Sequence, residues 1–117
     1  MKVIAVDFDG VIAKFDEWRG EDHFGEPIQG VREAMIELKK RGFKIVVYTC
    51  RACIEKIRAY LEENEIPYDF INENPYEPEG VHPRKLYADL YIDDRAINFK
   101  DWESTLKAID NWFAMVK

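Results

Sequence analysis

The chain has 117 residues, and at roughly 150 residues per domain this length predicts one domain over residues 1–117. Hydrophobic residues form 47% of it and charged residues 34%, a balance that excludes disordered, collagen-like and low-complexity classes. The net charge of −6, without any basic run, disfavours broad adhesion to nucleic acid or to an anionic membrane. No apolar stretch approaches the roughly 18 residues of a membrane span. We therefore expect a cytoplasmic globular protein.

Two short runs in the first half of the chain, residues 2–6 and 43–48, are rich in β-branched residues and almost continuously apolar. That composition is typical of strands covered on both faces in a parallel sheet. Between them, apolar residues recur at helical spacing from Val31 to Leu38, and Gly42 stands where a helix cap belongs. The first half therefore predicts a strand, a helix and a second strand.

The second half continues the alternation. Ile54, Ile57 and Leu61 share one helical face, and short strands are predicted at 68–71 and 88–92. The last segment carries a broad apolar stripe, which predicts a closing helix packed against the sheet. The members of this stripe are Trp102, Thr105, Leu106, Ile109, Trp112, Phe113 and Val116.

Strands that alternate with helices predict an α/β fold, here a three-layer sandwich around a Rossmann-like parallel sheet with right-handed crossovers. We expect the strand order 3-2-1-4, with the first strand central. Residues 11–28 and 73–84 are rich in glycine, proline or charge, so they are predicted to be loops. Both loops are too short to fold a cap domain, and the site is therefore expected to be open.

Acidic and hydroxyl side chains follow three of the predicted strands at the point where each strand ends. Asp7 and Asp9 follow the first strand, Thr49 the second, and Asp93 and Asp94 the fourth. Ligands bind at the carboxyl edge of an open parallel sheet, so these side chains should gather there. Clustered carboxylates repel one another unless a cation neutralises them, and an all-oxygen set suits Mg²⁺. The sequence predicts a magnesium site formed by the four aspartates.

These residues lie in segments that resemble the motifs of the haloacid dehalogenase-like hydrolase superfamily. The segments are VIAVDFDGVI at 3–12, VVYT at 46–49, Lys85, and LYIDD at 90–94. The resemblance covers residues 3–94, and its first and fourth motifs are the specific ones. The segment ADLYIDDR at 88–95 is also similar to the corresponding stretch of the 5'-deoxyribonucleotidase branch, which points to nucleotides.

The resemblance implies a phosphatase, with a role for each motif residue. It makes Asp7 the nucleophile and Asp9 the general acid and base. Thr49 and Lys85 become the phosphate holders, and Asp93 and Asp94 become the metal-side acids. We favour Asp94 as the direct ligand, and Asp93 is either a second ligand or its neighbour.

The chemistry of phosphate transfer supports these roles without reference to any family. A phosphomonoester repels a carboxylate nucleophile, so Mg²⁺, Lys85 and backbone N–H groups must neutralise the transferring oxygens. A second carboxyl group such as Asp9 can protonate the leaving oxygen and later take a proton from water. Gly10 lets the loop backbone approach the phosphate. Arg51 or Arg84 could take the phosphate-holding role of Lys85.

Two other functions remain open at this stage. Cys50 and Cys53 form a C-x-x-C at a strand end, as a thiol-redox module would. A receiver-like signalling domain also carries a phosphorylated Asp, an acid pair, a Thr and a Lys, but in another chain order. A phosphorylated substrate is the expected partner, either a small molecule, a nucleotide or, because the site is open, a macromolecule. A homo-oligomer that lends a neighbouring subunit as a lid is a further alternative.

Overall fold

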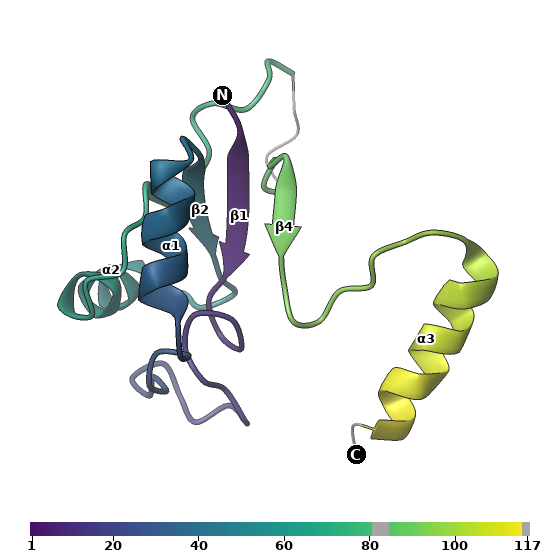
Figure 1. Ribbon diagram of the computed structural model, residues 1–117. Helices are drawn as coiled ribbons and strands as arrows, with labels where there is room; N and C mark the ends of the chain where they lie inside the picture. Colours follow the sequence, from purple (N-terminus) through teal and green to yellow (C-terminus); the bar gives the residue numbers. More distant parts are fainter. Residues whose placement is uncertain (81–84, 116–117) are drawn as a thin grey trace.

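The computed structural model describes residues 1–80 and 85–115, which contain a four-stranded parallel sheet and three helices (Figure 1). The strands are β1 (Val3–Asp7), β2 (Lys44–Tyr48), β3 (Phe70–Ile71) and β4 (Leu90–Ile92). The helices are α1 (Val31–Lys40), α2 (Ile54–Glu63) and α3 (Trp102–Met115). The sheet order is β3-β2-β1-β4, so β1 is central. The predicted α/β class and strand order are confirmed.

The strands are all parallel, and this brings their carboxyl ends to one edge of the sheet. Asp7 at the end of β1 is the register partner of Tyr48 at the end of β2. On the other side of β1, Val6 pairs with Ile92, the last residue of β4. The loops that leave these three strands therefore begin side by side.

The hydrophobic core lies between one face of the sheet and the first two helices. Alternate residues of β1 and β2 point to this face because side chains in a strand alternate between its two sides. They meet Met35 of α1 and Ile57 and Leu61 of α2, all of them buried. The strand residues of this core are Ile4, Val6, Ile45, Val47 and Ile71. Both helices thus cover the same face.

The opposite face of the sheet is covered by aromatic side chains instead of a helix within the described residues. Val3, Ala5 and Val46 are nevertheless almost completely buried there. The ring of Tyr76, in the segment after β3, packs against Phe70 at 5.9 Å between centroids. The segment that follows β3 therefore contributes to the cover on this side of the sheet.

The helix expected near the carboxyl end is present as α3, but the expectation that it packs against the sheet is wrong. Figure 1 shows the chain leaving β4 and running through residues 93–101 to a helix that stands apart from the sheet. Ile97 of this connecting segment lines an apolar groove together with Ile109 and Trp112 of α3. The helix thus packs on its own connection, which holds it away from the body of the molecule. Val116, the last member of the predicted stripe, lies outside the described residues.

The helices of the described part of the chain are 10, 10 and 14 residues long. None of them combines the length and the apolar character that a bilayer crossing requires.

The packing of α2 leads to a first prediction. Ile57 is fully buried in the core, so Ile57→Ala should lower the free energy of unfolding by about 2–5 kcal/mol through lost contacts and a residual cavity. The exposed Glu63→Ala, on the same helix, should change it by less than about 0.5 kcal/mol. Equilibrium unfolding in urea measures both. Equal effects of the two changes would mean that α2 does not cover the sheet.

Candidate functional site

The loop after β1 is a tight turn built around Phe8. The buried Phe8 accepts hydrogen bonds at its carbonyl from the backbone N–H groups of Ile12 at 2.9 Å and Ala13 at 3.0 Å. Its N–H donates to the carbonyl of Tyr48 at 3.2 Å, which extends the pairing of β1 with β2 by one residue. Because the ring of Phe8 is locked in the core, Asp7 and Asp9 on either side of it are held at the sheet edge.

Asp7, Asp93 and Asp94 form an acidic cluster at this edge. One carboxylate oxygen from each residue lies within 4.8 Å of those of the other two. The pKa of Asp7 is raised from 3.8 to about 7, mainly because the carboxyl is partly buried and secondly because the charge of Asp93 is close. Two adjacent strands thus deliver three carboxylates that repel one another when no cation is between them.

Gly10 allows Asp94 to reach the cluster. A Cβ at Gly10 would clash with the carboxylate of Asp94, and its φ of +90° is one that other residues rarely adopt. The Asp94 carboxylate therefore sits directly against bare backbone. This cradle, with only oxygen donors around it, fits a hard divalent ion such as Mg²⁺.

Tyr48 is a site residue that the sequence analysis missed. Its hydroxyl donates to Asp93 at 2.6 Å, and the other oxygen of Asp93 accepts the N–H of Arg95 at 2.8 Å. Burial and the bond to Asp93 raise the pKa of Tyr48 above its usual range, so it stays a donor. Both carboxylate oxygens of Asp93 already accept a hydrogen bond, which favours Asp94 as the direct ligand of a metal ion. The signal in the sequence is the position of Tyr48, at the end of β2 beside Asp7.

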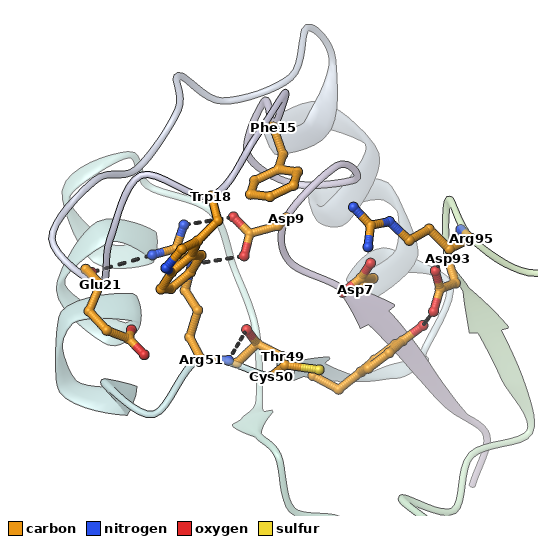
Figure 2. A pocket seen from close by; sticks show the side chains of 11 residues that line it. Asp7, Asp9, Phe15, Trp18, Glu21, Thr49, Cys50, Arg51, Asp93 and Arg95 are labelled. Atoms are coloured by element: carbon orange, nitrogen blue, oxygen red, sulfur yellow. Dashed lines mark hydrogen bonds and ion pairs between the residues drawn. The ribbon is translucent and has the colours of Figure 1, made fainter. Parts of the chain in front are cut away.

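Asp9 does not join the acidic cluster, contrary to its prediction as a metal ligand. Its two carboxylate oxygens accept hydrogen bonds from Arg51, at 2.8 Å from Nε and 3.0 Å from Nη2. The bidentate pair is one of the stronger hydrogen-bonding arrangements in proteins. It orients the Asp9 side chain toward Arg51, on the opposite side of the cavity from Asp93 (Figure 2).

Arg51 bonds to other parts of the protein through its whole guanidinium group, which corrects its predicted role as a phosphate ligand. Its side chain is only 3% exposed, and besides Asp9 its guanidinium donates to the carbonyls of Gly20, Glu21 and His23. All five N–H donors of the group are thereby engaged. The guanidinium also lies 4.9 Å from the ring centre of Trp18. A fully engaged guanidinium has no donor left for a phosphate, so Arg51 fixes Asp9 and the loop.

The cavity beside the cluster has a volume of about 480 Å³. Asp7, Asp9 and Thr49 line it, together with the aromatic rings of Phe15 and Trp18 (Figure 2). The remaining residues that line it are Glu21, Tyr48, Cys50, Arg51, Asp93 and Arg95. The cavity is therefore lined by both carboxylates and aromatic rings, with Phe15 near Asp9 in Figure 2.

Thr49 and Lys85, the two predicted phosphate holders, lie in different places. Thr49 lines the cavity, and its Oγ1 accepts the backbone N–H of Arg51 at 3.0 Å. Lys85 lies in a neighbouring cavity, where its Nζ is 5.3 Å from the ring centre of Tyr91. The two cavities share Tyr48 and Asp93. Arg84 lies outside the described residues.

Arg95 supplies a cation to the cavity. Its guanidinium points into the cavity in Figure 2 and lies 5.7 Å from the ring centre of Phe15. Within the described residues this guanidinium makes no ion pair with a carboxylate. Arg95 therefore retains donors that Arg51 does not.

The two cysteines are free thiols. Cys53 donates to the carboxylate of Glu21 at 2.8 Å, and its pKa is raised by burial and by that carboxylate. A raised pKa suppresses the thiolate that disulfide exchange requires. The environment of Cys53 therefore favours the neutral thiol, which is the less reactive form.

No protein-family model matches the chain, and no curated protein matches it significantly. A conserved protein from Bacteroides thetaiotaomicron, coded by a locus of that organism, has a similar solved structure. The TM-score is 0.68 and the identity 27%, over 95% of this chain and 91% of that one. The likeness supports the α/β fold, and the name of that protein states no activity.

The acidic cluster predicts a pH-dependent response to magnesium. Without a cation, the raised pKa of Asp7 means that the folded state binds more protons than the unfolded state between pH 3.8 and about 7. Stability therefore falls as the pH rises through this window. Because Mg²⁺ binds the ionised acids, we expect it to raise the melting temperature more near pH 8 than near pH 5, as measured by differential scanning fluorimetry. The same magnesium response in Asp94→Asn as in the wild type would contradict the assignment.

The cradle at Gly10 gives a second prediction for the same assay. Gly10→Ala should abolish most of the magnesium-dependent rise in melting temperature, because the new Cβ displaces the Asp94 carboxylate. Gly20→Ala is a matched control, since Gly20 also has a positive φ of +99° but a Cβ added there would meet nothing within 4 Å. Both variants carry similar backbone strain. Equal loss of the magnesium response in both would show that strain alone is responsible.

Proposed function

We propose that this chain is a Mg²⁺-dependent phosphomonoester hydrolase that acts through a phosphorylated Asp7. The observation that carries the proposal is the meeting of Asp7, Asp93 and Asp94 within 4.8 Å, at the sheet edge where ligands bind in open α/β folds. Asp9, two residues after Asp7, lines the same cavity. The resemblance of these segments to the haloacid dehalogenase-like hydrolases supports the same assignment.

Asp7 and Asp94 would hold the Mg²⁺ ion, with Asp93 beside them. When bound, the ion neutralises the acids and withdraws charge from the phosphate of the substrate. Tyr48 keeps Asp93 in a fixed orientation through its 2.6 Å hydrogen bond. Support of this kind keeps ligand side chains in the geometry that a metal needs.

In the first step, a carboxylate oxygen of Asp7 attacks the phosphorus, and the bond from phosphorus to the ester oxygen breaks. The electron pair stays on the leaving oxygen, which takes a proton from Asp9. Proton delivery of this kind accelerates such reactions by roughly 10²–10⁴.

In the second step, water attacks the phosphorus of the aspartyl phosphate and gives a proton to Asp9. The bond from phosphorus to Asp7 breaks, which restores the Asp7 carboxylate and releases inorganic phosphate. The two hydrogen bonds that Arg51 donates fix the direction of the Asp9 carboxylate. Arg51 is therefore a positioning residue.

The cavity suits a phosphomonoester that carries a planar ring, such as a nucleotide. Phe15 and Trp18 line it beside the acids, and aromatic side chains stack on flat rings. Arg95 has donors to offer a phosphate or leaving group. No cap domain covers the cavity in the described part of the chain, which leaves it accessible to extended substrates as well.

The two alternative functions have less support. A receiver-like domain would carry its phosphorylated acid after the third strand, but here β3 ends at Ile71 and is followed by Asn72. The side chain of Asn72 is engaged with the backbone of Thr49, by hydrogen bonds of 2.8 and 3.0 Å. A thiol-redox role for Cys50 and Cys53 gives no part to the acidic cluster of Asp7, Asp93 and Asp94.

The proposal predicts distinct losses for the two aspartates. Asp7→Asn should remove nearly all magnesium-dependent hydrolysis of an aryl phosphate, because the amide is a poor nucleophile. Asp9→Asn should lower kcat by roughly 10²–10⁴ and change KM little, because it removes proton transfer and leaves binding intact. Steady-state kinetics with Mg²⁺ and with a chelator measure both.

Asp16→Asn is the control, since Asp16 is exposed and pairs with Arg19 outside the cavity. It should retain wild-type kinetics. Wild-type hydrolysis by Asp7→Asn, or activity that is indifferent to chelation, would exclude the proposed mechanism.

A further inference from the structure

The apolar stripe of α3 is exposed. Trp102, Leu106 and Phe113 are 69%, 58% and 69% exposed. With Ile109 they follow the spacing i, i+4, i+7 and i+11, which places them on one face of the helix. An apolar stripe of this kind is normally buried against other apolar side chains. Its exposure here indicates a surface that binds a partner.

A second exposed apolar surface lies on β4 of the same chain. Leu90 and Ile92 are 57% and 37% exposed. In the sheet register they pair with Ile4 and Val6, so they point to the face that α1 and α2 cover. In Figure 1, α1 and α2 do not extend over β4. The exposed side of β4 therefore has room for a further helix next to α1.

The accessible surface area of the chain, compared with that of a compact monomer of the same mass, shows how much extra surface is exposed. A folded monomer of 13.8 kDa is expected to expose about 6,600 Å² and to have a radius of gyration of about 13.4 Å. This chain exposes 8409 Å², and its radius of gyration is 15.4 Å. The excess of about 1,800 Å² per chain would amount to about 3,600 Å² for two copies, within the range of obligate homodimers.

The connecting segment keeps α3 away from its own β4. The segment 93–101 runs outward from the sheet in Figure 1. Ala96 and Ile97 pack beside Ile109, Trp112 and Phe113 around an apolar groove of about 420 Å³. Phe99 also contacts Trp102, with 5.3 Å between ring centres. These contacts link α3 to its connecting segment in the arrangement of Figure 1, where the helix stands apart from β4 of its own chain.

We propose that the chain forms a twofold dimer by exchange of α3, in which the apolar stripe of each α3 packs on Leu90 and Ile92 of the other copy. A twofold exchange satisfies both exposed surfaces of both copies at once, since each copy offers the same helix and the same strand. The exchanged helix completes the layer formed by α1 and α2. The occupant of the β4 surface is therefore α3 of a second copy.

Sedimentation velocity across the micromolar range tests the oligomeric state of the full chain. The wild type should be a dimer, and Leu106→Glu should raise the dissociation constant by at least roughly 100-fold, because it places a charge in the apolar contact of both copies. Asn111→Glu is a matched control on the opposite side of α3, and it should leave the dimer intact. A wild type that is monomeric throughout, or a dimer that both changes leave equally intact, would overturn the proposal.

Disulfide trapping identifies which surfaces meet, in a background with Cys50→Ser and Cys53→Ser. One tagged chain carries Leu90→Cys, and a second, untagged chain carries Leu106→Cys. We expect a disulfide between the two different chains after coexpression and mild oxidation. A chain that carries both changes should cross-link to another chain. Cross-linking within a single chain would mean that α3 folds onto its own sheet, and a dimer without this cross-link would mean a different interface; each result would refute the exchange.

Discussion

The repulsion among three carboxylates governs the architecture of the candidate site. Asp7, Asp93 and Asp94 come from two neighbouring strands, and their oxygens lie within 4.8 Å of one another. Partial burial, and after it the charge of Asp93, raises the pKa of Asp7. Under the proposed function, a bound cation would offset this charge. Much of the surrounding structure, from the bare backbone at Gly10 to the Tyr48 hydroxyl, serves to keep these acids together.

The second acid of the first motif is treated differently from the other three. Asp9 faces a guanidinium that is buried among aromatic rings, so its charge is balanced by the protein itself. The charge of Asp9 is thus compensated on one side of the cavity, and on the other side lie the acids that a cation would neutralise under the proposed function. This separation gives Asp7 and Asp9, only two residues apart, different chemical environments. The proposed roles of nucleophile for Asp7 and proton carrier for Asp9 rest on this separation.

The sequence predicted those features that follow from the hydrophobic pattern and the strand ends. The order 3-2-1-4 and the gathering of Asp7, Asp93 and Asp94 follow from parallel strands whose carboxyl ends share an edge. The pairing of Arg51 with Asp9 was not predictable, because it depends on how the loop over residues 15–28 folds back onto α2. The position of α3 was missed for a related reason. An amphipathic stripe indicates that a face will be covered, but it carries no information about which surface covers it.

Anomalous diffraction from crystals grown with Mn²⁺, as a stand-in for Mg²⁺, tests whether the three acids share a cation. We expect one anomalous peak in contact with carboxylate oxygens of Asp7 and Asp94, with Asp93 beside it and Asp9 still paired with Arg51. Crystals that contain Mn²⁺ but show no peak at this edge of the sheet, with the three side chains turned apart, would contradict it.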